Sequence, residues 1–300
     1  MTELLRHSRV ARWLPERPRD GHKGTFGHLF VLAGSRGLSG AARLACEAAY
    51  RTGAGLVTLG VPKPLANALE AALLETMTLS LPATDMETLS SSALAHALAF
   101  ANGRQAAVVG PGLSRHADTA LLAREMALRC AVPTVLDADA LYALCREEPF
   151  DGFPETGDGG ESDASTRVMT PHPGEMSRLT GMAVADIQAD REGTAAQFAE
   201  KWRAVVVLKG RHTVIAAPDG RLAVNPTGNQ GMATGGTGDV LAGMIGALLA
   251  QGTDTWGAAC AGVYAHGLAG DIAARRMTPR ALVAGDLLAA LPEAWRELEG

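Results

Sequence analysis

Cysteine is scarce in this chain, and none of it is arranged as a metal or redox motif. The 300 residues include four cysteines, and no two of them form a Cys-X-X-Cys pair. Each lies among alanine and leucine, which predicts small core residues rather than ligands or bridges. The His-Glu-X-X-His pattern and the Cys/His spacings of zinc sites are also missing. These absences exclude the common zinc sites built by protein ligands alone.

Long apolar runs and an excess of positive charge are lacking as well. No run reaches the roughly 18 apolar residues that a membrane-spanning helix needs. The N-terminal segment carries charges throughout and lacks the apolar stretch of a secretory signal. The net charge of −5 at pH 7 argues against nucleic acid as the main partner. We therefore expect a cytoplasmic protein with neither a membrane nor a nucleic acid as its partner.

Two signatures of nucleotide and ester chemistry are absent. Neither the Walker A pattern nor the Gly-X-Ser-X-Gly nucleophile elbow occurs, which excludes P-loop enzymes and hydrolases of the elbow type. After the strand predicted at 28–33, glycines recur at intervals of three, at Gly34, Gly37 and Gly40. This spacing differs from the Gly-X-Gly-X-X-Gly fingerprint of Rossmann folds, although it still lets a ligand approach the backbone closely.

Apolar segments of strand length alternate with helical segments along most of the chain. The predicted strands are residues 28–33, 56–61, 106–109, 134–136, 167–170 and 204–208. The predicted helices are residues 41–53, 65–74, 87–100, 117–131, 183–201, 240–250, 255–275 and 281–298. This alternation predicts an α/β fold with a mostly parallel sheet covered by helices on both faces. Residues 213–217 and 222–224 flank a hairpin-like turn, which predicts late antiparallel edge strands.

Composition predicts one folded unit with a short preceding segment. At 47% hydrophobic residues the chain can bury a sizeable core. We expect residues 1–20 to form an irregular approach segment and residues 21–300 to form a single domain. Residues 147–163 hold seven acids and no base, so we expect 147–166 to be an acidic surface loop without a catalytic role.

The most informative stretch is residues 225–251, NPTGNQGMATGGTGDVLAGMIGALLAQ. Its second half is apolar on every side, which predicts a fully buried helix. Gly235–Gly238 precede this helix. A glycine turn at a helix N-terminus offers free backbone N–H groups and the positive end of the helix dipole to an anion. Asp239 follows in the first turn, where it is either a catalytic carboxylate or simply a helix cap.

Glycines and carboxylates also follow the predicted strands. Gly34, Gly110, Gly112, Asp137 and Asp139 all stand at the carboxyl ends of strands. These ends share one edge of a parallel sheet, and ligands collect there. We therefore expect these residues to converge on one crevice.

His172 stands between two prolines after another predicted strand. This position favours a role in binding over a purely structural one, because loop residues at strand ends commonly carry sites. Asp137, Asp139 and Glu175 could hold Mg²⁺ through water, since Mg²⁺ prefers a few carboxylates together with phosphate oxygens. For Asp139 and Glu175 the alternative is a helix cap or a turn former.

These features together favour phosphoryl transfer. A carboxylate beside an anion-binding turn can take a proton from a substrate hydroxyl while the turn stabilises the charge on the transferring phosphoryl group. Because the Walker A and serine-nucleophile patterns are absent, this is the chemistry that Asp239 and the glycine turn support.

Several segments resemble a known family. Gly235–Asp239 (GGTGD) resembles the anion-hole motif of the ribokinase-like superfamily. TPHPGE at 170–175 and NPTGNQGMATGGTGD at 225–239 are more specific, and they resemble the ADP/ATP-dependent NAD(P)H-hydrate dehydratases. Further matching segments are residues 23–60, 108–113, 135–141 and 206–215. The resemblance covers nearly the whole chain after residue 20.

The resemblance implies a fold and a reaction. The fold is a ribokinase-like three-layer α/β/α sandwich. The reaction removes water from the S epimer of NADHX or NADPHX at the expense of ADP or ATP, through a phosphorylated intermediate. Such an enzyme is a carbon–oxygen lyase that repairs nicotinamide nucleotides. Bacterial members prefer ADP, which yields AMP and phosphate, and the implied metal is Mg²⁺.

The resemblance also implies roles for individual residues. Asp239 would be the base that activates the hydroxyl, and Gly236, Thr237 and Gly238 would form the anion hole. The residues implied to contact the hydrated dinucleotide are Ala41 or Ala42, Gly112, His172 and Asp239. The residues implied to line the nucleotide are Lys209, Gly210, Arg211, His212, Thr213 and Gly238.

Partners and rival functions follow from the same family. Many members form tetramers, and some carry an N-terminal domain that interconverts the R and S hydrates. Only about 20 residues precede the match here, so we expect the epimerase to be a separate protein. One alternative is a ribokinase-like kinase for hydroxymethylpyrimidine or hydroxyethylthiazole, which GTGD alone does not distinguish. The other is a nucleotide-binding regulator without turnover, which an intact Asp239 disfavours.

Overall fold

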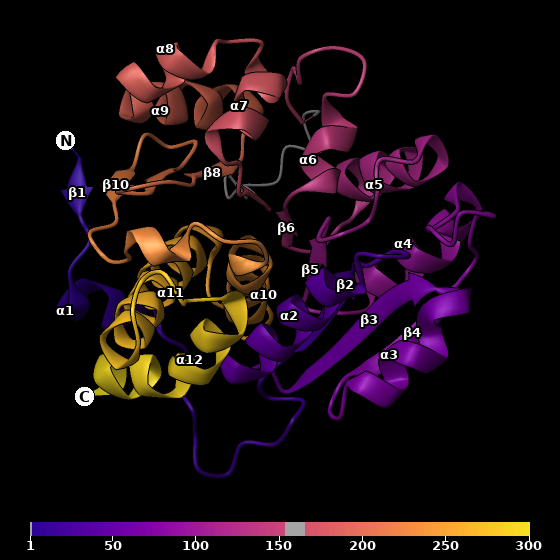
Figure 1. Ribbon diagram of the computed structural model, residues 1–300, viewed down its shortest axis with the longest axis horizontal. Coiled ribbons are helices and arrows are strands. Elements are labelled where there is room, and N and C mark those ends of the chain that lie inside the picture. The colour runs from indigo at the N-terminus through magenta and orange to yellow at the C-terminus, as the bar shows by residue number, and fades with distance from the viewer. Residues whose placement is uncertain (1, 154–165) are drawn as a thin grey trace.

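The computed structural model describes residues 2–153 and 166–300 (Figure 1). Much of the predicted acidic loop at 147–166 therefore lies outside the described residues. Among the helices that the structure describes, none combines the length and the apolar character needed to cross a bilayer.

Ten strands of the described residues form one sheet. In spatial order they are β1 (Glu3–Leu4), β10 (Leu222–Val224), β9 (Val214–Ala216), β8 (Val205–Leu208), β7 (Arg167–Met169), β6 (Thr134–Leu136), β5 (Ala106–Val109), β2 (His28–Leu32), β3 (Leu56–Pro62) and β4 (Met77–Leu81). From β8 to β4 every neighbouring pair is parallel. The predicted mostly parallel sheet is confirmed.

Strand order reverses between β2 and β5, because the chain builds β3 and β4 on one side and then returns to add β5 to β8 on the other. Such a reversal opens a crevice outside the carboxyl ends of the two strands. The late strand β9 is antiparallel to both β8 and β10, as predicted for the late strands. The outermost position beside them is taken by β1, which pairs in parallel with β10.

Helices cover both faces of the sheet and complete three layers. One face carries α1 (His7–Val10), α2 (Ser39–Arg51), α3 (Ala66–Ala72), α10 (Thr237–Ala250), α11 (Thr255–Arg276) and α12 (Ala284–Glu299). The other carries α4 (Leu94–Asn102), α5 (Ala117–Arg129), α6 (Asp139–Leu144), α7 (Pro173–Thr180), α8 (Val184–Ala189) and α9 (Arg191–Trp202). The alternating side chains of the buried strands feed a separate apolar cluster on each face.

Two predicted helices are wrong in detail. The helix predicted at 87–100 begins only at Leu94, after a short 3₁₀ turn, because the Ser90 hydroxyl accepts from the Ser92 N–H and caps that turn instead of extending a helix. The helix predicted at 183–201 is two helices. Asp190 separates them, and its carboxylate caps α9 by accepting from the Gly193 N–H at 2.8 Å. The strands β1 and β4 and the helices α1, α6 and α7 were not predicted at all.

The helix α10 is buried over most of its length. All residues from Val240 to Ala250 are buried, as the sequence predicts. Figure 1 shows α10 between α11 and α2. Its two glycines make this possible: a methyl group at Gly243 would overlap the carbonyl oxygen of Ala45 in α2, and one at Gly246 would overlap Val108 in β5. The helix therefore packs directly on backbone and sheet.

This packing predicts a stability cost for one added methyl group. We expect Gly243→Ala to lower the free energy of unfolding by about 1–3 kcal/mol, because α10 must shift away from α2. Gly285→Ala in α12 is the matched control, since a methyl group there meets nothing within 4 Å. We expect that control to be neutral or stabilising by up to about 1 kcal/mol. Denaturant unfolding of the two variants checks this, and equal effects would contradict the packing argument.

Candidate active site

The start of α10 presents backbone donors that have no acceptor in the part of the chain that the structure describes. The helix begins at Thr237, and Gly236 precedes it with a φ of 91°, a left-handed conformation that favours glycine. Among the described residues, no acceptor pairs with the N–H groups of 237–239. The Thr237 hydroxyl instead donates back to the carbonyl oxygens of Met232 at 3.0 Å and Thr234 at 3.1 Å. The turn at 236–238 thus has the backbone geometry expected of an anion-binding turn.

Asp239 lies in the first turn of α10 without capping it. Within the described residues the helix has no side-chain cap, so capping does not account for this carboxylate. Burial, reinforced by the negative charge of Asp137, raises the pKa of Asp239 to about 7, although Lys209 acts in the opposite direction. A carboxylate with such a pKa is partly ionised near neutral pH and can accept a proton there.

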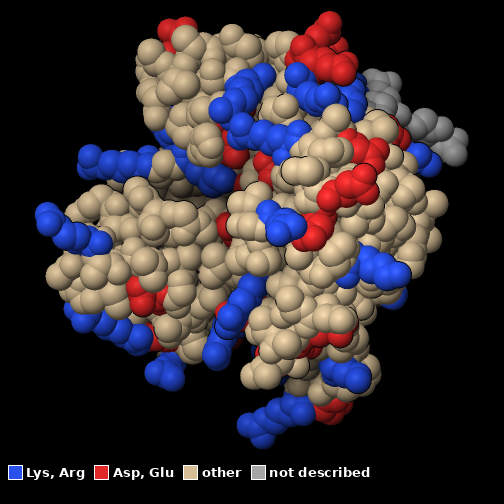
Figure 2. Space-filling model, turned by 45° about the vertical axis from the view of Figure 1, so that its right-hand side comes forward, with Lys and Arg blue, Asp and Glu red and all other residues tan. Residues whose placement is uncertain are grey.

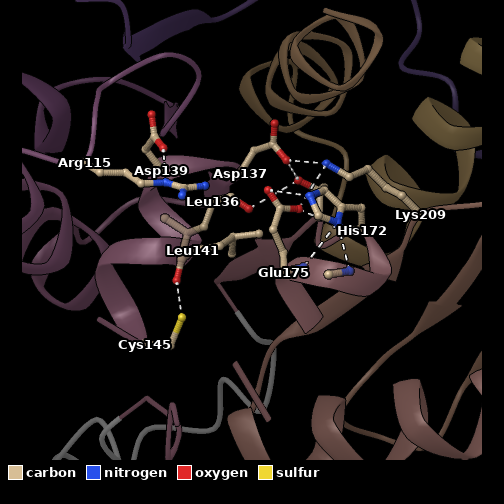
Figure 3. A network of polar contacts seen from close by, with 11 residues as sticks. Arg115, Leu136, Asp137, Asp139, Leu141, Cys145, His172, Glu175 and Lys209 are labelled. Atoms are coloured by element: carbon tan, nitrogen blue, oxygen red, sulfur yellow. Dashed lines mark hydrogen bonds and ion pairs between the residues drawn. The ribbon is translucent and has the colours of Figure 1, made fainter. Parts of the chain in front are cut away.

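A lysine and two carboxylates form an ion-pair network beside this helix start (Figure 3). Lys209 Nζ lies 2.8 Å from Asp137 Oδ1 and 3.7 Å from Glu175 Oε2. The Thr170 hydroxyl also donates to Asp137 Oδ1, at 2.7 Å. Burial alone would lower the pKa of Lys209, but Asp137 and Glu175 outweigh it and raise the pKa. Lys209 is therefore a permanent cation in the site.

The network follows from the parallel sheet. Asp137, Thr170 and Lys209 come directly after β6, β7 and β8, which are neighbours. The network also reaches the helix start. A methyl group on Gly238 would lie 3.3 Å from Lys209 Nζ and 3.8 Å from Asp137 Oδ2. Free N–H groups, a cation and the Asp239 carboxylate thus surround one point at the edge of the sheet.

Asp139 and Glu175 have structural partners, as the alternative interpretation expected. Asp139 Oδ2 accepts from the Ser114 N–H at 2.8 Å, and Oδ1 lies 3.7 Å from Arg115 Nε, so Asp139 holds the loop after β5. Glu175 Oε2 accepts from the His172 N–H at 2.8 Å.

His172 completes a reciprocal cap with Glu175. Its Nδ1 accepts from the N–H groups of Gly174 at 3.0 Å and Glu175 at 3.2 Å, which places it at the N-terminus of α7. Residues 171–175 are therefore not all loop, because the helix begins at Pro173. The side chain of His172 is 52% exposed, and its Nε2 lies 3.6 Å from Glu175 Oε1. His172 thus adjoins the Lys209 network through Glu175.

A cavity of about 830 Å³ opens next to the helix start. Its wall includes residues 209–213, 225–230, Thr237, Gly238 and His266. The structure thus brings together all five residues predicted from 209 to 213, and places Gly238 with them. The volume lies in the range of small-molecule and cofactor pockets, about 300–1,000 Å³. Figure 2 shows a cleft on this molecule with Lys and Arg along its edge and Asp and Glu inside it.

The residues predicted to contact the hydrated dinucleotide lie partly at the strand-order reversal between β2 and β5. The loops after β2 and β5 meet there, where the Gly34 N–H donates to the Pro111 carbonyl at 2.9 Å. Gly112 packs so closely on α2 that an added methyl group would lie 3.0 Å from Ala41 Cβ. Ala42 is fully buried, which leaves Ala41 as the partly exposed member of the pair.

Two features of the site were missed by sequence reasoning. The Lys209–Asp137 pair needs the strand order, which no local motif reveals. His266 lies in the middle of α11 and matches no motif, yet its Nε2 is 2.9 Å from the Thr237 carbonyl oxygen. The signal that could have found it is an uncharged polar ring in an otherwise alanine- and glycine-rich helix.

The carboxylates suit Mg²⁺ only in the indirect manner that the sequence predicted. Over residues 2–153 and 166–300, no three His, Cys, Asp or Glu side chains are grouped to hold a metal ion. Asp137 Oδ1 is occupied by Lys209 and Thr170, whereas Oδ2 faces Gly238. A metal held partly by water and phosphate oxygens fits such a donor set.

The raised pKa of Asp239 predicts a pH-dependent stability. A carboxyl group whose pKa rises on folding stabilises the folded state while it is protonated; this contribution is present below about pH 4 and is lost as the pH rises through about 7. Asp239→Asn stays neutral. We expect it to raise the free energy of unfolding by about 1–3 kcal/mol at about pH 8 and to leave it nearly unchanged at about pH 4. An equal change at both pH values in denaturant unfolding would contradict the assignment.

Comparison with known proteins identifies the relatives of this chain. The family model described as NAD(P)H-hydrate dehydratase matches residues 29–293. The chain is 49% identical over 286 residues to the bifunctional NAD(P)H-hydrate repair enzyme Nnr of Moorella thermoacetica, covering 95% of this chain and 52% of that protein. It is 34% identical over 295 residues to the ADP-dependent (S)-NAD(P)H-hydrate dehydratase of Bacillus subtilis, covering 97% and 96%. The chain spans about half the length of the first curated relatives it matches.

A solved structure superposes on almost the whole chain. The crystal structure of the ADP/ATP-dependent NAD(P)H-hydrate dehydratase from Bacillus subtilis, co-crystallised with ATP/Mg²⁺, superposes with a TM-score of 0.83 at 31% identity and covers 99% of each chain. The predicted ribokinase-like α/β/α fold is therefore confirmed. The family model matches residues 29–293, and the Bacillus subtilis relative is 34% identical over 97% of this chain. The chain therefore belongs to the NAD(P)H-hydrate dehydratase family.

Proposed function

We propose that this chain is an ADP-dependent (S)-NAD(P)H-hydrate dehydratase, which restores NADH or NADPH from the hydrated S epimer. The observation that carries the proposal is the position of Asp239. Its carboxylate, with a pKa of about 7, lies in the first turn of a helix whose backbone donors are free, beside the Lys209 cation. Names of the relatives support the same reaction.

The proposed reaction has two steps, and each balances. First the hydroxyl oxygen of the hydrate attacks the β-phosphorus of ADP, AMP leaves, and Asp239 takes the hydroxyl proton. Free N–H groups of 237–239 and the Lys209 ammonium offset the charge on the transferring group. Then the carbon–oxygen bond breaks and phosphate leaves with that oxygen. The adjacent ring carbon loses its proton to the departing phosphate or to water, and the electron pair of that carbon–hydrogen bond restores the nicotinamide double bond.

We place the two substrates on either side of Asp239. We assign the nucleotide to the cavity of about 830 Å³, where Lys209, Gly210, Arg211, His212 and Thr213 line its wall with Gly238. The hydrate is assigned to the crevice at the strand-order reversal, against Ala41 and Gly112, with His172 at its far end. The phosphoryl group then passes across the N-terminus of α10.

Magnesium and the choice of nucleotide belong to the same proposal. The Bacillus subtilis enzyme of the solved structure was co-crystallised with ATP/Mg²⁺. The relative from the same organism that was found by sequence is named ADP-dependent. Asp137 and Glu175 would hold Mg²⁺ through water, and the ion would neutralise phosphate charge. We propose ADP as the working donor, with AMP and phosphate as products.

Partners are proposed from the same relatives. Several are bifunctional repair enzymes that are about twice as long as this chain, which supports a functional partnership with an NAD(P)HX epimerase. We also propose a homotetramer as the working assembly. Size-exclusion chromatography with light scattering distinguishes this from a monomer.

Regain of reduced nicotinamide absorbance tests the reaction directly. The chain is incubated with NADHX, ADP and Mg²⁺, and we expect NADH to reappear with one AMP and one phosphate per turnover. Absence of NADH would refute the proposal. Phosphorylation of hydroxymethylpyrimidine or hydroxyethylthiazole in parallel incubations would favour the rival kinase function instead, and nucleotide binding without any turnover would favour a regulator.

Asp239→Asn separates the catalytic role from binding. We expect turnover to fall at least about 100-fold, because the hydroxyl proton has no acceptor, while the Kd for ADP changes by less than about threefold. In the native chain kcat/KM should rise with pH up to about 7, where Asp239 is ionised. Collapse of ADP binding in the variant would make Asp239 structural.

Two replacements separate the cap made by His172 from its proposed contact with the hydrate. His172→Asn keeps an acceptor for the N–H groups of α7 but removes Nε2, whereas His172→Ala removes both. We expect both variants to raise the KM for the hydrate about 3- to 10-fold, and only His172→Ala to lose about 1 kcal/mol of stability. A native KM in His172→Asn would restrict His172 to capping.

A further inference from the structure

His266 contacts the first peptide unit of α10 from the neighbouring helix α11. Its Nε2 lies 2.9 Å from the Thr237 carbonyl oxygen. A carbonyl oxygen only accepts, so Nε2 carries the proton and donates, and this hydrogen bond assigns the tautomer. The ring also forms part of the wall of the nucleotide cavity.

The Thr237 carbonyl and the Gly238 N–H belong to one planar peptide unit. A contact that holds the carbonyl therefore also holds the direction of the N–H. At the start of a helix the carbonyl points along the axis into the helix, and the N–H points outward. The Gly238 N–H is one of the donors that have no acceptor among the described residues.

This peptide receives an additional support from outside its own helix. The helix lacks a side-chain cap among the described residues, and glycine flanks Thr237 on both sides, so the backbone here has more freedom than in a typical first turn. The Thr237 hydroxyl anchors one side of the residue to the loop at 232–234. The Thr237 carbonyl, which as the first carbonyl of the helix also accepts an intrahelical N–H bond, receives its second hydrogen bond from His266.

We propose that His266 is a positioning residue that aims the Gly238 N–H at the transferring phosphoryl group. The donor comes from a rigid element, because most of α11 is buried against α10 and α12. The same helix holds the cavity loop: the Tyr264 carbonyl accepts from the Thr227 hydroxyl at 2.9 Å, and Asp271 Oδ2 accepts from the Gly228 N–H at 2.9 Å. Thus α11 contacts both the first peptide of α10 and the loop at 227–228 that lines the cavity, and it holds the two in a constant relative position.

His266 acts in this role as a neutral donor. Burial, with a contribution from the charge of Lys209, lowers its pKa to about 4. It therefore carries no charge across the neutral range and supplies no proton to the reaction. An amide can replace a neutral N–H donor of this kind, whereas a thioether cannot.

The test compares His266→Gln with His266→Met. Glutamine places an N–H near the position of Nε2, and methionine has a similar length without a donor. We expect His266→Met to lower kcat about 10- to 100-fold, by analogy with loss of an oxyanion-hole donor, with the Kd for ADP within about twofold of native. His266→Gln should recover most of the activity and keep the rise of kcat/KM up to about pH 7.

The turnover experiment rests on the proposed function. A second experiment therefore measures AMP binding, which does not depend on hydrate turnover. Aluminium fluoride with Mg²⁺ and AMP occupies the position of the transferring phosphoryl group. We expect it to tighten AMP binding at least about tenfold in the native chain and in His266→Gln, but not in His266→Met. If the native chain shows this tightening but never restores NADH, the reaction fails and the inference about His266 stands.

Three outcomes would overturn the inference. Native kcat and native fluoride response in His266→Met would show that the peptide needs no support. A loss of ADP affinity with native kcat would make His266 a nucleotide contact. A folded His266→Gln, as judged by thermal unfolding, that is as inactive as His266→Met would show that the ring itself is required rather than its N–H.

Discussion

The close packing of α10 against α2 and the sheet is the constraint on which the site depends. Gly243 and Gly246 let this helix lie directly on the backbone of α2 and on β5. Its N-terminus is thereby brought to the carboxyl edge of the sheet, beside the ends of β6, β7 and β8. A buried helix cannot move its first turn without disturbing this packing, so the backbone proposed to bind the phosphoryl group is held in place before any ligand arrives.

The charged side chains at the edge of the sheet also depend on where the N-terminus of α10 lies. Asp137 is buried and would be costly without a partner, and Lys209 supplies one at 2.8 Å. Asp239 lies nearby and has no comparable ion pair over residues 2–153 and 166–300, and its pKa rises to about 7. Two aspartates in one site thus differ in role because only one is neutralised directly. That division leaves Asp239 available for the proposed proton transfer, while Lys209 stays charged for the phosphoryl group.

The strand pattern and the glycine stretch made much of the fold and site predictable. The alternation of apolar strands and helices identified the parallel sheet, and the uninterrupted apolar run after Asp239 identified a buried helix. The failures lie where local preferences compete. Ser90 and Asp190 form caps instead of continuing helices, and His172 caps the start of a helix where prolines suggested a loop. The strand β1 is too short to show the alternating apolar pattern by which a strand is predicted.

By itself the sequence determined which residue types stand at strand ends and at the start of α10, because those follow from local periodicity and from motif. Only the tertiary structure decided which of them meet. The Lys209–Asp137 pair spans 72 positions along the chain, and His266 reaches Thr237 across 29. Contacts of this kind depend on strand order and helix packing, which arise from burial of the whole apolar surface rather than from any short segment.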